Sequence, residues 1–376
     1  MSTVTDQHRG TTSAEIDPTE ERRLVWKLDL HLLPLMAMVY LLQYLDKHAI
    51  NCAAASKLIP ALELGIDDFI NAFSLFYIGQ VIADYPVAYI LSRYHFPHFV
   101  IGATVIAWSV AETCVGALSS DTENKLMGFS VTRFFLGVSE SAISPSFVVL
   151  ISNWYRRREH PERVAAWMCM NGIGQMIISG GFAAQSNDLF LYNLPTGGFS
   201  FATVWISALI PRFFPGTRIY TATALTLLPL AGSSLIVALP LFRPTPPVRW
   251  EVVIATWLAN AGSAPLCACA SLVASNVKGN TKKSVVSTGF FVALCVGGVI
   301  SPHAWKETDQ QPWIKGSILS VGGWVVLIVI LIVYLSVVKR ENKKRDRMAE
   351  EGEAEVELSE DSDLTDKEDS GFRYST

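Results

Sequence analysis

Apolar segments long enough to cross a lipid bilayer constrain this chain more than any other feature. The clearest runs from Ile318 to Tyr334 and contains no charged residue. A spanning helix needs roughly 20 mostly apolar residues, and it satisfies its own backbone hydrogen bonds. The sequence therefore predicts an all-α membrane protein with about ten transmembrane helices. The predicted spans are 29–50, 70–92, 98–118, 130–153, 163–185, 188–210, 219–240, 250–275, 284–304 and 315–338, of which the second and sixth are the least clear because they contain Asp84 and Pro195.

Charged residues are concentrated outside these spans. Residues 339–376 hold 21 of the 64 Lys, Arg, Asp and Glu residues, and the first 28 residues hold nine. The 310 residues between them carry 34, about 11%, whereas a soluble domain carries roughly 25%. We divide the chain into a cytosolic tail (1–28), an amino-terminal helix bundle (29–185), a carboxyl-terminal helix bundle (186–338) and an acidic, disordered cytosolic tail (339–376).

The distribution of Lys and Arg predicts the orientation in the membrane. With the first tail in the cytosol, 19 Lys and Arg residues close to span ends fall on the cytosolic side and six on the outer side. This ratio follows the positive-inside rule and predicts that both termini are cytosolic. No cationic start precedes a cleavable apolar run, so no signal peptide is expected. The six cysteines lie in or beside spans, which argues against a disulfide framework.

Six charged residues lie inside the predicted spans. A charge in the bilayer costs free energy, so each is a functional candidate. Arg133 and Glu140 are seven residues apart, which places both on one helix face with Gly137 between them, leaving room for a substrate or a close helix. Asp46 lies about 26 Å and Arg133 about 28 Å from the cytosolic ends of their helices, so the two could interact. The six are Asp46, Lys47, Asp84, Glu112, Arg133 and Glu140.

These residue types suit a proton-coupled carrier of anions. A buried cation attracts a carboxylate, and Arg grips it through two parallel hydrogen bonds, so Lys47 and Arg133 are the candidate substrate-binding residues. A carboxyl group in a half-dry cavity can load and release a proton, which makes Asp46 and Glu140 the candidates for proton coupling. The alternative is that these four charges only neutralise one another and hold two helices together.

Other polar residues have weaker assignments. Asp84 and Arg93 are candidates for a cytosolic gate, with a solvated helix end as the alternative. Glu112 is expected to be structural. The candidate cavity-lining residues are Asn171, Trp257 and Asn260.

Several segments resemble one family. Leu24–Pro34, Tyr44–Lys47, Arg133–Glu140 and Ser152–Arg156 resemble the amino half of fungal allantoate permease-like transporters, in the anion:cation symporter group of the major facilitator superfamily. Tyr192–Gly197 and the stretch 264–283 resemble the carboxyl half. The resemblance covers about residues 20–345. It implies a major facilitator fold, and it implies that Asp46, Arg133 and Glu140 match coupling and substrate positions. Lys47 stands where the family usually has Arg.

The sequence departs from this family in two places. The loop 92–98 lacks the family's Gly-x-x-x-Asp-Arg-like gating motif. The family also has twelve spans, and its sixth and seventh are missing here at the junction 184–188. Because the family's seventh helix lines the transport cavity, a ten-span chain could have lost alternating access between two six-helix halves.

The predicted function is proton-coupled uptake of a small organic anion such as allantoate, nicotinate or pantothenate. The alternative is a transport-inactive shortened protein: a sensor, a remnant or a truncated gene model. No protease or hydrolase motif occurs in a span, so no enzyme is expected. We expect a multi-pass protein of the plasma membrane, a monomer in the lipid bilayer, with no cofactor apart from the coupling proton and no nucleic-acid partner.

Overall fold

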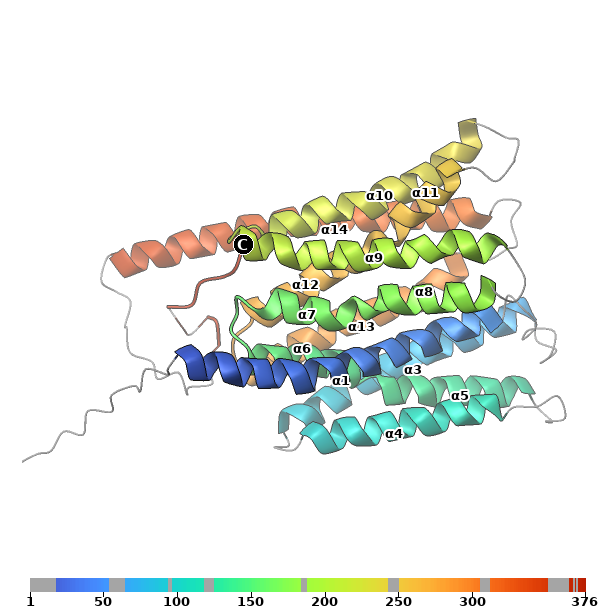
Figure 1. Cartoon of the computed structure of the whole chain (residues 1–376), viewed down its shortest axis with the longest axis horizontal. Coiled ribbons are helices and arrows are strands. Elements are labelled where there is room, and N and C mark those ends of the chain that lie inside the picture. The colour runs from blue at the N-terminus through green and yellow to red at the C-terminus, as the bar shows by residue number, and fades with distance from the viewer. Residues whose placement is uncertain are drawn as a thin grey trace, which may run out of the picture.

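The computed structural model describes residues 18–53, 65–93, 97–117, 125–183, 188–242, 250–304, 312–350, 365–367, 369 and 371–376. Within these residues the regular elements are all helical, and the long helices run side by side along one axis (Figure 1). They are α1 (Pro18–Ala53), α3 (Ile66–Arg93), α4 (Pro97–Gly116), α5 (Lys125–Glu140), α6 (Ile143–Trp154), α7 (His160–Met168), α8 (Met170–Ala183), α9 (Asp188–Phe213), α10 (Arg218–Phe242), α11 (Trp250–Ala259), the short 3-10 helix η2 (Asn260–Gly262), α12 (Ser263–Asn276), α13 (Asn280–Ala304) and α14 (Pro312–Glu350).

The helices correspond to the ten predicted spans. Eight helical segments of the described chain are long and apolar enough to cross a membrane. The remaining two predicted spans, the second and the fifth, correspond to α3 and to the pair α7–α8, which lie in the same bundle. The prediction of an all-α membrane protein is confirmed. The sixth span, which Pro195 made unclear, is among the eight as Leu194–Phe213, so one internal proline does not end it.

Three predicted spans consist of more than one helix. The fourth is divided between α5 and α6 at Ser141 and Ala142, directly after Glu140. Pro145 has no N–H and its ring excludes the carbonyl four residues earlier, which explains an interruption at Ser141. The fifth divides at Cys169, and the eighth passes through η2 between α11 and α12. At the break in a discontinuous helix, some backbone N–H and carbonyl groups have no partner within the helix. Such groups can face a cavity between two helix bundles.

Close packing of small residues joins the helices. A Cβ atom on Gly137 would lie 1.9 Å from the carbonyl oxygen of Phe76, so α5 contacts the backbone of α3 there. Gly137 therefore serves helix packing, one of the two roles that the sequence left open. A Cβ atom on Gly172 would lie 2.5 Å from the carbonyl oxygen of Gly197, and one on Gly197 would lie 2.4 Å from that of Gly172. These reciprocal contacts bring α8 of the amino half directly against α9 of the carboxyl half.

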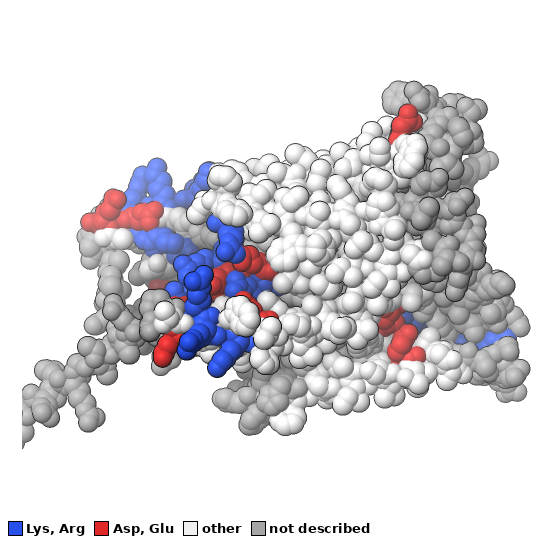
Figure 2. All heavy atoms as spheres, viewed as in Figure 1, with Lys and Arg blue, Asp and Glu red and all other residues white. Residues whose placement is uncertain are grey.

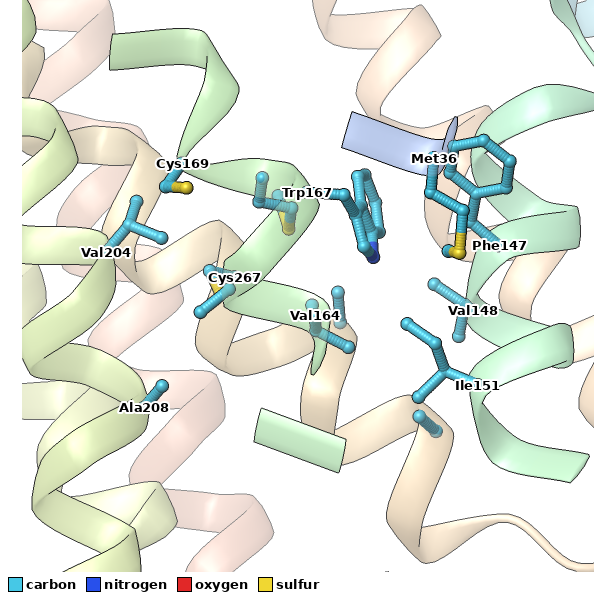
Figure 3. Packing of buried hydrophobic residues seen from close by; sticks show 14 of the residues in the cluster. Met36, Phe147, Val148, Ile151, Val164, Trp167, Cys169, Val204, Ala208 and Cys267 are labelled. Carbon is cyan, nitrogen blue, oxygen red and sulfur yellow. The ribbon is translucent and has the colours of Figure 1, made fainter. Parts of the chain in front are cut away.

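A large hydrophobic cluster fills the bundle between the two halves. Trp167 of α7 is fully buried and packs edge-on against Tyr40 and Phe147, with ring centroids 4.6 and 5.6 Å apart. Figure 3 shows α6 residues such as Phe147 and Ile151 on one side of Trp167, with Val204, Ala208 and Cys267 on the other. Because α9 and α12 supply the second group, this cluster holds the amino and carboxyl halves together.

Lys and Arg residues gather at one end of the bundle, where α1 begins and α14 ends (left in Figures 1 and 2). We call this the cationic end. It includes Arg157, Arg163, Arg212, Arg218, Lys278, Lys282, Lys283 and Arg345. The middle of the molecule shows almost no charge in Figure 2, and large apolar side chains such as Ile330 and Val333 of α14 are exposed there. This band suits contact with lipid.

The predicted disordered tail differs from the structure in two parts. α14 continues through the charged residues 339–350, because Glu, Lys, Arg, Met and Ala there are strong helix formers. The described residues between Asp366 and Thr376 lie against the cationic end, with Phe372 buried. The acidic stretch 351–364, which carries most of the prediction, lies outside the described residues.

Candidate functional site

A cavity of about 240 Å³ lies between the amino and carboxyl halves. Tyr40, Gln43 and Lys47 of α1 line one side, and Phe291 and Cys295 of α13 line the other. Further side chains come from α3, α6, α8 and α12. Pockets for drug-sized ligands have volumes of about 300–1,000 Å³, so this cavity suits a smaller solute.

Lys47 and Glu140 form the ionic centre beside this cavity. Lys47 Nζ lies 2.7 Å from Glu140 Oε2, and Gln43 Nε2 donates a 2.8 Å hydrogen bond to the same oxygen. Glu140 is completely buried, and the other oxygen of its carboxylate has no hydrogen-bond partner. Gln43 precedes Lys47 by one helical turn, so α1 presents both side chains on one face. Removing Lys47 would leave the Glu140 carboxylate buried without its counter-ion, which is strongly destabilising, whereas the Lys47 side chain is 26% exposed.

Arg133 lies close to this ion pair and is held by aromatic rings. Its guanidinium carbon is 5.0 Å from the ring centroid of Phe76 and 5.9 Å from that of Phe73. Lys47 Nζ lies over the same Phe76 ring, at 5.3 Å. None of the three guanidinium nitrogen atoms has a hydrogen-bond partner, although the side chain is almost completely buried. Cation–π contacts therefore stabilise two neighbouring cations, and Arg133 retains its hydrogen-bonding capacity.

Asp46 does not pair with Arg133. The depth argument allowed this contact, but Asp46 Oδ2 instead accepts a 2.8 Å hydrogen bond from Trp108 Nε1 of α4. Glu112 follows Trp108 by one turn on α4, so it faces the same side, and one of its oxygens is buried without a hydrogen-bond partner. The equal depth of Asp46 and Arg133 in the membrane could not predict on which side of α1 the Asp46 side chain lies.

Asp84 is almost completely buried, and neither of its carboxylate oxygens has a hydrogen-bond partner. It follows the cavity-lining Gln80 by four residues on α3, so it lies one turn from the cavity toward the cationic end. The alternative of a solvated helix end does not fit this burial. Arg93 closes α3, and its side chain lies outside the described residues.

The three residues proposed to line the cavity are separated in the structure. Asn171 of α8 lies on the cavity wall. Trp257 and Asn260 do not, and Asn260 is exposed at the start of η2, where it donates a hydrogen bond to the carbonyl oxygen of Thr256. A polar residue inside a span does not always face the cavity. The side-chain direction of Asn260 depends on the break in the helix at η2.

The sequence argument missed several polar side chains of the site. Gln43, Tyr44 and Gln80 line the cavity, and the Tyr44 hydroxyl donates a 2.8 Å hydrogen bond to Gln175 Oε1. Gln43 could have been identified, because it lies one turn before Lys47 and is polar within a span. Within the described residues no group of three or more His, Cys, Asp and Glu side chains could hold a metal ion.

A bundle of apolar helices in two halves, with a small cavity between them that both polar and apolar side chains line, is an arrangement that suits a transporter-type membrane protein. Comparison with known proteins supports this class: residues 33–187 match the model of the Major Facilitator Superfamily. The matched region ends one residue before α9 begins.

The relatives are fungal transporters. Uncharacterized transporter C757.13 of Schizosaccharomyces pombe is 25% identical over 468 aligned positions, covering 94% of this chain and 87% of the relative. Uncharacterized transporter C460.05 of the same yeast is 25% identical over 96% of this chain and 87% of its own length. The allantoate permease of Saccharomyces cerevisiae is 30% identical over 166 residues, which is 44% of this chain and 30% of the permease.

The all-helical bundle and the match over residues 33–187 fit the predicted major facilitator fold, and the chain resembles allantoate permease-like transporters, as predicted; the relatives named here are transporters. It is also shortened. Its alignment with the first relative is 468 positions long and the chain has 376 residues, so at least 92 aligned positions of that relative have no counterpart here. The location of the shortening at residues 184–188 stays a prediction.

Proposed function

We propose that this protein takes up a small organic anion together with a proton, with both termini in the cytosol of a plasma-membrane protein. The observation that carries the proposal is the ion pair between Glu140 and the cavity-lining Lys47, beside an almost completely buried Arg133 without a hydrogen-bond partner. The 30% identity to an allantoate permease over part of the chain supports a carboxylate of the allantoate, nicotinate or pantothenate type.

The ion pair suggests how proton and anion could be coupled. While Glu140 is ionised, its carboxylate is the counter-ion of the Lys47 ammonium group. When Glu140 takes up a proton, Lys47 loses its counter-ion, and a substrate carboxylate can replace it without changing the net charge of the site. Loading one anion with one proton thereby avoids an uncompensated buried charge, which would cost several kcal/mol.

Arg133 would supply the second contact to the substrate. A guanidinium group can donate two parallel hydrogen bonds to a carboxylate, and all of its donors are without partners here. The aromatic rings of Phe73 and Phe76 hold the group in place without using these donors. Asp46 is proposed as a second proton-binding group, with Trp108 fixing its carboxylate.

Uptake of radiolabelled carboxylates into proteoliposomes tests the proposal. We expect uptake of at least one of allantoate, nicotinate and pantothenate, driven by an inwardly directed proton gradient and abolished by Arg133→Ala. Arg156→Ala, which removes an exposed cation paired with Glu21, is the matched control and should leave uptake unchanged. Arg133→Lys keeps the charge and should fold even if Arg133→Ala does not. Uptake that survives both substitutions at Arg133 would refute its assignment.

The shortened length favours a second candidate, a protein that binds an anion without transporting it. At least 92 positions of a full-length relative are absent, and alternating access depends on two complete helix bundles. A thermal shift caused by the same carboxylates, with no uptake into proteoliposomes under any gradient, would support this candidate.

A further inference from the structure

The described residues of the segment from Asp366 to Thr376 form a dense set of contacts at the cationic end. Arg345 of α14 donates hydrogen bonds to the carbonyl oxygens of Asp366, Asp369 and Phe372, at 2.9, 3.1 and 2.8 Å. Its side chain is only 4% exposed. One guanidinium group therefore holds three carbonyl oxygens of the segment and fixes its path.

The carboxyl half supplies further partners. Asn276, at the end of α12, exchanges two hydrogen bonds with the backbone of Ser375, at 2.7 and 3.0 Å. Lys278 lies 2.6 Å from Asp369, and Lys282 pairs with Asp366. These contacts combine hydrogen bonds to the backbone with two ion pairs. They therefore depend on both the backbone conformation and the charge of the segment.

The segment also reaches the amino half through one residue. The guanidinium carbon of Arg157, in the connection between α6 and α7, lies 4.0 Å from the ring centroid of Phe372. The Nε of Arg157 donates a 2.8 Å hydrogen bond to the carbonyl oxygen of Ser275, and Nη2 of Arg218 donates one of 2.8 Å to the carbonyl oxygen of Arg157. Phe372 thus covers one of the contacts that join the two halves at this end, where Glu162 also pairs with Arg212 and His160 with Ser275.

From these contacts we infer that the described residues of this segment (366, 367, 369 and 371–376) are an intramolecular peptide ligand of the cationic end, and that their docking keeps the two halves closed there. Arg345, Asn276, Lys278 and Lys282 hold the segment on the carboxyl half, and Phe372 transmits the restraint to Arg157 of the amino half. Release of the segment uncovers Arg157 and favours opening at this end. The inference concerns the closed arrangement and holds whether or not the proposed uptake occurs.

The accessibility of a buried cysteine tests this inference without substrate or transport. Ala274 of α12 is 3% exposed and belongs to the cluster between the halves. We would place Ala274→Cys in a full-length chain whose six natural cysteines are replaced, and measure its rate of reaction with a water-soluble maleimide. Arg345→Gln removes the anchor of the segment, and Arg347→Gln removes an exposed cation two residues further along the same helix as the matched control.

We expect Arg345→Gln to raise the labelling rate by at least about tenfold, because losing even one of the three hydrogen bonds from the charged guanidinium has that effect, and Arg347→Gln to leave it unchanged. Phe372→Ala keeps the anchors and should raise the rate as well, because it removes the bridge to Arg157. Thermal unfolding midpoints separate opening from global unfolding. Equal rates for Arg345→Gln and Arg347→Gln, or an unchanged rate for Phe372→Ala at an unchanged midpoint, would overturn the inference.

Discussion

Lys47 and Glu140 lie 2.7 Å apart, and they come from two helices that are separated by nearly one hundred residues of chain. Glu140 is the last residue of α5, at the point where Pro145 interrupts the fourth span. The interruption and the buried carboxylate therefore coincide. A discontinuous helix places unpaired backbone groups and polar side chains next to each other inside the membrane. Either kind of group would be unfavourable there if it faced lipid without a partner.

Glu140→Gln should separate anion binding from proton binding. The amide keeps the size of the side chain and an oxygen that can accept the bond from Gln43, but it cannot take up the coupling proton. We expect the pH dependence of substrate binding to weaken, because only Asp46 then remains as a proposed proton-binding group, while the unchanged protein binds more tightly at lower pH. Equilibrium binding of the radiolabelled carboxylate measures this. Glu251→Gln, on the exposed start of α11, is the control, and an undiminished pH dependence in Glu140→Gln would contradict the coupling role.

Gly137→Ala should destabilise the protein, because the added methyl group meets the carbonyl oxygen of Phe76 at 1.9 Å. Overpacking of this kind costs about 1–3 kcal/mol. Gly322→Ala in α14, where no atom lies within 4 Å of the added carbon, should stabilise by up to about 1 kcal/mol. Apparent melting midpoints in detergent compare the two. If both substitutions shift the midpoint in the same direction, the close contact between α3 and α5 is not as described.

Trp108→Phe tests the hydrogen bond that holds Asp46. The substitution keeps an aromatic ring but removes the donor, and a hydrogen bond to a charged group contributes about 1.5–3 kcal/mol. We expect a lower melting midpoint, whereas Trp154→Phe, at an exposed position at the end of α6, should have little effect. An unchanged midpoint for Trp108→Phe would show that Asp46 has another partner.

Docking of residues 366–376 should depend on pH. The hydrogen bond from Lys278 lowers the pKa of Asp369. Burial acts to raise the pKa of Asp366, but hydrogen bonds from Lys282 and Tyr374 outweigh it and lower that pKa. Carboxyl groups with lowered pKa stabilise the docked form above their unfolded pKa of about 3.9, and this contribution is lost as the pH falls through the folded values.

Tyr374 sets the upper pH limit of docking. Burial and its bond to Asp366 raise the pKa of Tyr374 to about 12, so the docked form favours the protonated phenol. That contribution is present below the unfolded pKa of about 10 and is lost as the pH rises toward 12. Hydrogen exchange of residues 371–376, corrected for the intrinsic rate, should show a plateau of protection from about pH 5 to 9. Protection that rises below pH 4 would contradict the ion pairs.

The sequence predicted the helices well because each span is a long apolar segment with its own hydrogen bonds. It also singled out Lys47, Arg133 and Glu140, since charges within spans are few, and the structure places these three side chains close together. It could not predict their partners, because the rotation of each helix about its axis depends on packing at positions such as Gly137 and Gly172. The docked segment was missed for a different reason: the tail 339–376 as a whole is acidic, which is typical of disorder, and the partners of the segment come from four separate parts of the chain.

The reciprocal contact of Gly172 and Gly197 also constrains how this molecule can move. Only four residues separate α8 from α9, and the backbones of the two helices touch, so neither half can slide along the other at this seam. The motion that remains possible is a hinge rotation of one half relative to the other about the contact between α8 and α9. The largest displacement would then fall on the opposite side of the bundle, where α3 meets α13.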